Sequence, residues 1–223
     1  MTSVANQKLV DRLRAEADPQ RAVPMRAYMR DQFPFLGIPS PRLSTLVRAM
    51  ALPKPTEDDL RELALFLWEQ PEREFQYVAC GQLRRHVKVC GPGFLDVARQ
   101  LIVTKSWWDT VDTLASHTVG PLVRKHPELL ATMDAWIGAE NMWLARTAIL
   151  HQLGYKDSTD AARLFHYCAA RAGHSDFFIR KAIGWALREY AKSDPMAVRA
   201  FVRAHDAALS GLSKREALRN IGG

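Results

Sequence analysis

An amphipathic segment recurs along the chain at intervals of 35 residues. Trp108, Trp143 and Phe178 stand 35 residues apart, in the segments SWWDTVDTLA, MWLARTAILH and FFIRKAIGWA. The segment EREFQYVACGQLRRH (72–86) lies about one interval earlier. Apolar residues are spaced three and four apart along most of the chain, which is the helical pattern, and strand-like alternation is absent. A two-helix repeat of this length predicts an α-solenoid of HEAT or armadillo type.

A repeat of this kind stacks its helices on one continuous core, so we expect a single domain over residues 1–223. The pattern indicates about a dozen helices with short connections, and the concave face of a curved solenoid is its usual binding surface. The formal net charge is +7, which makes an anionic partner plausible without naming one.

Capping signals predict where several helices begin. Ser40, followed by Pro41, has the pattern of an N-cap, and Thr56 precedes three acidic residues. The sequences SWWD (106–109) and SKRE (213–216) both match the capping-box pattern. Prolines near helix ends predict stops at Pro53, Pro71 and Pro127.

Some classes of protein are disfavoured by what the sequence lacks. The three cysteines, Cys80, Cys90 and Cys168, form no CxxC pair, so neither a disulfide framework nor a zinc site is indicated. The first 18 residues are polar and charged and carry no signal-peptide core. No apolar run is long enough to span a bilayer. We therefore expect a cytoplasmic protein without a metal site.

The helix that starts near Ser106 combines aromatic and acidic residues. Trp107, Val111, Ala115 and Val119 form its apolar stripe, and Asp112 lies at the stripe's edge. Trp108 is four residues before Asp112 and shares its face, whereas Asp109 is expected to cap the helix. Asp112 and Trp108 are either solvated edge residues or parts of a functional site. His117 lies on a different face of a regular helix and is assigned no role.

Two further residues do not fit an ordinary amphipathic helix. Arg146 lies in the middle of an apolar face, where a guanidinium is costly unless it is paired. It therefore needs a carboxylate from a neighbouring helix or a phosphate from a ligand. The 35-residue interval places it within one residue of the equivalent of Asp112. Trp185 lies off its helix's apolar stripe, beside basic residues, and serves either a binding surface or the cover of a neighbouring loop.

Basic residues surround these positions, and aromatic faces with basic side chains suit nucleic-acid binding. A carboxylate in such a groove suits stabilisation of a developing positive charge. The candidate DNA contacts, besides Arg146, are Lys105, Arg180, Lys181, Arg188, Lys214 and Arg215.

The sequence as a whole resembles the DNA alkylation repair family, the AlkD-type glycosylases with HEAT-like repeats. The resemblance lies in PMRAYMRDQFPFLGIPSP (24–41), LIVTKSWWDTVD (101–112), NMWLARTAILHQLGYK (141–156), FFIRKAIGWALREYAK (177–192) and LSKREAL (212–218). It implies a right-handed α-solenoid of about six HEAT-like helix pairs with a concave DNA-binding groove. It also implies a monofunctional DNA glycosylase that excises 3-methyladenine and 7-methylguanine from double-stranded DNA in base excision repair.

The family's site residues match residues of this chain one by one. The resemblance implies that Asp112, Trp108 and Trp185 are catalytic and that Arg146 lies in the cleft with them. It further implies a monomer in the bacterial cytoplasm that acts on DNA without a cofactor or metal. The alternative is a non-catalytic HEAT-type scaffold that binds DNA or protein, which would not need an acid between tryptophans.

Overall fold

The structure is a computed structural model that describes residues 3–221. The regular elements of this part of the chain are all helices and it contains no strand, so the all-α prediction is confirmed. By its internal contacts the chain divides into two compact units, which comprise the described residues 3–97 and 98–221. A single domain over residues 1–223 stays a prediction. None of the described helices is long and apolar enough to cross a membrane.

The core of the first unit lies between four of its helices. Its helices are α1 (Ser3–Arg14), α2 (Pro19–Tyr28), α3 (Ser40–Ala49), α4 (Glu57–Glu69) and α5 (Arg73–His86), with a 3-10 turn at Val87–Val89. Helices α3 and α4 each pack against both α1 and α5. Leu9, Leu67 and Phe75 are fully buried between them. Helix α6 (Phe94–Val103) crosses the division between the units.

The second unit holds all of the predicted site residues. Its helices are α7 (Trp108–Leu114), a π turn (Ala115–Val119), α8 (Gly120–Lys125), α9 (Leu130–Ile137), α10 (Met142–Leu150), α11 (Ala161–Ala170), α12 (Phe177–Tyr190), α13 (Pro195–Ala204) and α14 (Gly211–Leu218), with 3-10 turns at Pro127–Leu129 and Lys156–Ser158.

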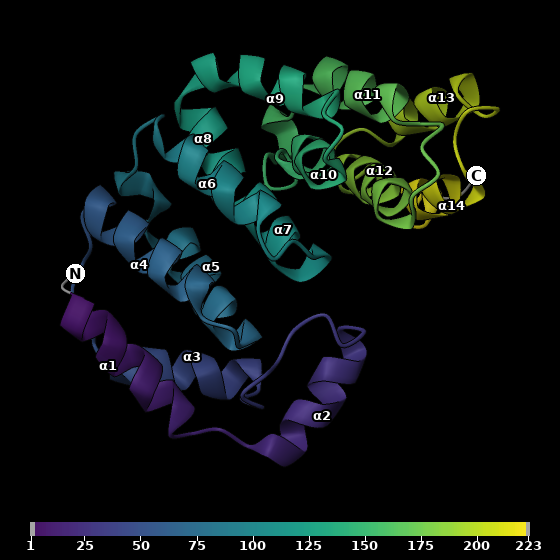
Figure 1. Cartoon of the computed structure of the whole chain (residues 1–223). Coiled ribbons are helices and arrows are strands. Elements are labelled where there is room, and N and C mark those ends of the chain that lie inside the picture. The colour runs from purple at the N-terminus through teal and green to yellow at the C-terminus, as the bar shows by residue number, and fades with distance from the viewer. Residues whose placement is uncertain (1–2, 222–223) are drawn as a thin grey trace. The chain divides into compact units, whose positions relative to one another are not determined.

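These helices form two rows within the second unit. Helix α10 packs between α7 and α12, and α12 in turn packs against α14. The second row covers the first, because α9 packs on α10, α11 packs on α10 and α12, and α13 packs on α12 and α14 (Figure 1). The first turns of α7, α10 and α12 hold Trp108, Trp143 and Phe178. The 35-residue interval therefore marks successive helices of one row.

The predicted helix boundaries are right in part. Thr56 and Asp59 form a reciprocal capping box at the start of α4, as predicted. Ser40 is not an N-cap, because α3 begins at Ser40 itself and Pro39 precedes it. The proline stops are confirmed: Pro53, Pro71 and Pro127 follow the ends of α3, α4 and α8.

Both predicted capping boxes in the second unit are wrong. Ser106 donates its hydroxyl to the carbonyl of Ile102, 2.6 Å away, so it completes the end of α6. Trp107 then takes an extended conformation as the N-cap of α7, and Asp109 lies inside the first turn of that helix. Ser213 lies inside α14, whose N-cap is Ser210. Each serine satisfies a hydrogen bond to another turn or helix, which the local pattern does not reveal.

Candidate active site

A buried ion pair joins α7 to α10. The Arg146 guanidinium donates from Nε to Asp112 Oδ1 at 2.7 Å and from Nη2 to Asp112 Oδ2 at 2.8 Å. The Arg146 side chain is 3% exposed and that of Asp112 is 12% exposed. Bidentate, charge-assisted hydrogen bonds of this kind are among the strongest that arginine and a carboxylate form. Of the two partners expected for Arg146, the structure shows the carboxylate from a neighbouring helix.

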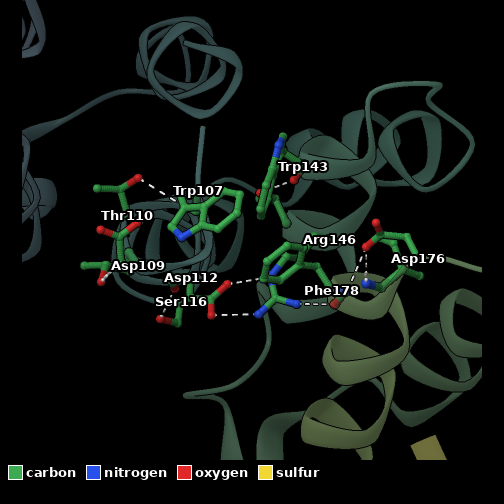
Figure 2. A network of polar contacts seen from close by, with 12 residues as sticks. Trp107, Asp109, Thr110, Asp112, Ser116, Trp143, Arg146, Asp176 and Phe178 are labelled. Carbon is green, nitrogen blue, oxygen red and sulfur yellow. Dashed lines mark hydrogen bonds and ion pairs between the residues drawn. The ribbon is translucent and has the colours of Figure 1, made fainter. Parts of the chain in front are cut away.

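The third hydrogen bond of Arg146 extends the pair to α12. Its Nη1 donates to the main-chain carbonyl of Phe178, and the Phe178 ring lies 5.9 Å from the guanidinium carbon (Figure 2). Arg146 thus makes hydrogen bonds to two other helices of the row. Because all these bonds go to protein groups, contact between Arg146 and a DNA phosphate stays a prediction.

Aromatic rings pack beside this network. The Phe178 ring centre lies 5.1 Å from that of Trp107 and 5.2 Å from that of Trp143. The repeat aligns Trp108 with the other two residues, but Trp107 is the one that joins them. The reason is the extended backbone at Trp107, which precedes α7, whereas Trp143 and Phe178 lie inside their helices. Trp107 is packed as predicted, although part of it remains exposed.

Burial has a direct effect on the acidity of Asp112. Desolvation raises the pKa of its carboxyl above the usual value, and the hydrogen bonds from Arg146 act in the opposite direction. A carboxylate held between these two influences is rigid and poorly hydrated. Each of its oxygens retains a lone pair beyond the one used by Arg146. The group can therefore still accept a hydrogen bond from a water or face a cation.

A pocket of about 300 Å³ lies beside Asp112. Asp112 of α7 lines it, together with Ser116 and His117 of the π turn. Trp185 and Glu189 of α12 also line it. Asp112 and Trp185 are 73 positions apart in the sequence, and the fold brings both to this pocket. Trp108 is half-buried at the start of α7 and does not line the pocket. A catalytic role for each of these three residues stays a prediction.

The prediction for His117 is wrong on geometry, because His117 lines the same pocket as Asp112. In a regular α-helix, residues five apart point about 140° from each other. The chain departs from this geometry at the π turn, where the amide of Gly120 donates to the carbonyl of Ala115, five residues back. The longer turn reduces the angle between Asp112 and His117.

Two residues explain why the chain makes a π turn there. Pro121 has no amide hydrogen, and in an α-helix its ring would collide with the carbonyl of His117, four residues earlier. A side chain at Gly120 would place its Cβ 2.2 Å from the carbonyl oxygen of His151, so only glycine fits against α10's end. The π turn accommodates both residues without ending the helix. The GP pair was thus the signal that could have placed His117.

Two of the predicted DNA contacts form ion pairs with an acidic residue of α14. Lys181 and Arg188 of α12 both pair with Glu216, the first at 2.7 Å. The hydrogen bond from Lys181 and the charge of Arg188 lower the pKa of Glu216 below its usual value. Trp185, between these cations on α12, also lines a second open pocket with Arg188. The ion pairs fix where the cations lie but leave DNA contact a prediction.

The remaining basic candidates lie at the edges of helices. Arg180 donates from Nε to the carbonyl of His174 at 2.8 Å, and Lys214 pairs with Asp206 at 2.8 Å. Lys105 lies between α6 and α7 with a positive φ of 49°. Arg215 is exposed on α14. Contact between DNA and any of these four side chains stays a prediction.

A basic groove in the first unit was missed by the sequence argument. It has a volume of about 430 Å³ and lies between α3 and α5. Arg48, Arg84 and Arg85 line it together with Tyr77 and the amide of Gln82. The sequence signal was the RR pair at the end of EREFQYVACGQLRRH, which sits one 35-residue interval before the Asp112 helix.

Among residues 3–221, no group of three or more His, Cys, Asp or Glu side chains could hold a metal ion. The second unit instead offers a carboxylate, an indole and an imidazole around one pocket, a combination suited to catalysis. Fold and site thus define a helical-repeat protein with an enzyme-like site. The chain belongs to the DNA alkylation repair enzyme family, whose family model matches residues 9–221.

A solved structure supports the same assignment. The chain is 31% identical to a predicted DNA alkylation repair enzyme from Enterococcus faecalis, with a TM-score of 0.83. The match covers 92% of this chain and 96% of that one. No curated protein matches the sequence. The family match and the structural likeness thus agree on the DNA alkylation repair enzyme family, whose name implies a DNA substrate.

Proposed function

We propose that the protein is a monofunctional DNA glycosylase that releases N3- and N7-alkylated purines from double-stranded DNA in base excision repair. The observation that carries the proposal is the placement of Asp112, fixed by Arg146, beside the pocket that Trp185 lines. We further propose that it works as a monomer in the bacterial cytoplasm, without a cofactor.

The proposed chemistry follows from the charge of the lesion. Alkylation at N3 or N7 makes the purine cationic, so the bond between C1′ and the base nitrogen breaks with its electron pair going to the base. The base leaves neutral, and positive charge develops on the sugar. Water then forms the new bond to C1′ and loses a proton, which leaves an abasic site and an intact backbone.

The residues at the pocket have distinct roles in this scheme. The Asp112 carboxylate stabilises the cationic sugar and orients or deprotonates the water. The Trp185 ring faces the cation, and cation–π attraction in a desolvated site contributes about 2 kcal/mol. Arg146 positions Asp112 through its two hydrogen bonds. Trp108 is the third residue proposed to be catalytic, with its ring against the cationic sugar or base.

The rival function is a helical scaffold that binds DNA or protein without chemistry. The scaffold reading offers no reason to hold a carboxylate in place with a buried guanidinium beside an open indole. The two functions differ in one measurement, the release of free base from a duplex that contains 7-methylguanine.

The test uses single-turnover conditions, with matched duplexes that carry 7-methylguanine or a neutral lesion, hypoxanthine. We expect release of 7-methylguanine by the wild type, much slower release of hypoxanthine, and a loss of about a hundredfold or more in Asp112→Asn. Absence of 7-methylguanine release by the wild type would sink the proposal. Comparable rates on both bases would contradict the mechanism.

The Asp112→Asn variant needs a control for stability, because it leaves the buried Arg146 without its carboxylate. Leu9→Ala is suitable, since Leu9 is fully buried in the first unit and its truncation costs about 2–5 kcal/mol. Assayed at a temperature where both variants are folded by circular dichroism, Leu9→Ala should release base at the wild-type rate. A rate loss in both variants would point to stability rather than chemistry.

A further inference from the structure

We infer that Glu189 is a specificity-determining residue of the Asp112 pocket, a second carboxylate whose charge recognises the positive charge of the lesion. The inference rests on the proposed function and adds to it the group that distinguishes a cationic lesion from a neutral base. Its basis is the position of Glu189 at the border of two pockets, the one beside Asp112 and a basic one.

The first step is that α12 presents Glu189 and Trp185 together. The two residues are four apart in this helix, so their side chains lie on the same face, one turn from each other. Both line the pocket of about 300 Å³ beside Asp112, and both line a neighbouring open pocket of about 370 Å³. The carboxylate therefore stands next to the indole that is proposed to face the cation.

The second step concerns which carboxylate of the pocket can respond to a bound cation. Asp112 shares its charge with the buried Arg146 through two hydrogen bonds. Glu189 pairs with Lys192 at 2.6 Å, and these two side chains are 30% and 61% exposed. An ion pair so accessible to water contributes little to stability. Glu189 is therefore the carboxylate that can exchange its lysine for a positive charge on the substrate.

The third step is the charge on the other side of Glu189. Arg188, Lys192 and Arg219 line the neighbouring pocket, and Arg188 also pairs with Glu216 of α14. Basic side chains attract the phosphates of DNA, but they repel a cationic base in the adjoining pocket. A carboxylate at the border reduces this repulsion. It allows a protein that needs cations to hold DNA to admit a cationic base beside them.

The expected effect of this carboxylate is selective. Removal of its charge should weaken the binding of a cationic group in the pocket and leave the binding of a neutral group of the same shape unchanged. At separations of several ångströms in a partly screened site, one unit charge changes an equilibrium constant by about fivefold. If Glu189 served only the stability of α12, its loss would change both affinities by the same factor.

The experiment measures the affinity of the protein for two duplexes that differ at one position. One duplex carries a pyrrolidine abasic analogue, which is cationic at neutral pH, and the other carries the neutral tetrahydrofuran analogue. Fluorescence anisotropy at fixed salt gives the ratio of the two dissociation constants, in which charge effects common to both duplexes cancel. The wild type should prefer the pyrrolidine duplex, and Glu189→Gln should lower this preference about fivefold.

Two further variants give this comparison its direction and its control. Lys192→Gln removes the ammonium that competes for Glu189, so it should raise the preference for the cation about threefold. Glu140→Gln removes the same charge as Glu189→Gln from an exposed position that lines neither pocket, and it should leave the preference unchanged. Equal preferences in the wild type and Glu189→Gln, no preference in the wild type, or a lower preference in Lys192→Gln would each overturn the inference.

Release of 7-methylguanine under single-turnover conditions separates this inference from the proposed function. Glu189→Gln should release the base about fivefold more slowly than the wild type. Equal rates, together with an unchanged preference for the cation, would overturn the inference and keep the glycosylase. A preference that depends on Glu189, without base release by the wild type, would keep the cation site and reject the proposed function instead.

Discussion

The guanidinium of Arg146 makes its three hydrogen bonds to groups on other helices. A charge held in this way stabilises the protein only while its partner is present, because a lone buried charge costs several kcal/mol. At the scale of single residues, Asp112 and Arg146 therefore behave as one unit. The interaction between the two residues can therefore be measured by protein stability alone, without an activity assay.

A double-mutant cycle tests this dependence. Asp112→Asn and Arg146→Met should each lower the free energy of unfolding by about 3 kcal/mol, because each leaves the other residue's polar groups unsatisfied. The double variant should lose clearly less than the sum of the two, since no unpaired charge remains. Urea denaturation at neutral pH measures all three. Strictly additive losses would contradict the pair as the structure shows it.

His151 predicts how stability depends on pH. It is neutral in the folded state, with a pKa lowered by desolvation to about 4 from an ordinary value of 6.5. As the pH falls below 6.5, the unfolded chain takes up a proton that the folded chain does not, so the free energy of unfolding decreases. Between pH 7 and pH 5 the loss from this residue is about 2 kcal/mol.

The control for this prediction is His151→Gln, which removes the titrating group. Urea denaturation at pH 7, 6 and 5 should show a shallower decline for the variant than for the wild type. Equal slopes in the two proteins would show that His151 takes up its proton without unfolding.

At the scale of helices, glycine decides how closely α12 and α14 approach. A Cβ added at Gly184 would lie 2.5 Å from the Cβ of Glu216 and 2.9 Å from the carbonyl oxygen of Ser213. These are atoms that cannot move away without shifting α14. The contact also carries the Lys181 and Arg188 pairs with Glu216, so close packing and the placement of these cations depend on one residue.

We therefore expect Gly184→Ala to lower the free energy of unfolding by about 2 kcal/mol, as overpacked cores do. Gly81→Ala is the matched control, because Gly81 lies inside α5 and a Cβ there meets no atom within 4 Å. That variant should gain about 1 kcal/mol from helix propensity. Thermal or urea unfolding of both proteins decides the matter. Stabilisation by Gly184→Ala would mean that α14 does not pack as described.

At the scale of the whole molecule, charge is the property that both units share. The net charge of +7 includes the arginines of the groove between α3 and α5. Under the proposed function these arginines would bind backbone phosphates, which carry most of the salt-dependent affinity for DNA. The groove lies in the first unit, whereas the predicted site residues lie in the second. Binding and chemistry can therefore be separated by mutation.

Arg84→Gln with Arg85→Gln should weaken binding to an undamaged duplex and make its salt dependence shallower. Two lost phosphate contacts reduce the slope of log K against log salt by about 1.8. Base release from saturating 7-methylguanine duplex should be unaffected. The control is Arg26→Gln with Arg203→Gln, which removes the same charge from exposed positions outside the groove. An equal loss of slope in both proteins would assign the effect to net charge alone.

The sequence by itself determined the helical class, the 35-residue spacing and the residues that are out of place on an ordinary helix. Helical periodicity is a local property, so apolar spacing, the Thr56 capping box and the proline stops were readable without a structure. Asp112, Arg146 and Trp185 could be selected because each violates the pattern of its own helix. The family resemblance added the reaction, which no pattern of spacing contains.

Only the tertiary structure decided which groups meet. The partner of Arg146 is 34 residues away, and the choice between carboxylate and phosphate depended on how α7 packs against α10. Ser213 looks like a cap but donates its hydroxyl to the carbonyl of Arg180, 33 residues away, an acceptor that only packing supplies. Ser106 donates to Ile102, four residues earlier, which is a local alternative to the capping pattern. His117 reaches the pocket because close contact at Gly120 and the missing amide of Pro121 favour a π turn. Sequence reasoning assumes the regular angle between successive residues of an α-helix. That angle does not hold where close contact with a neighbouring helix favours a π turn.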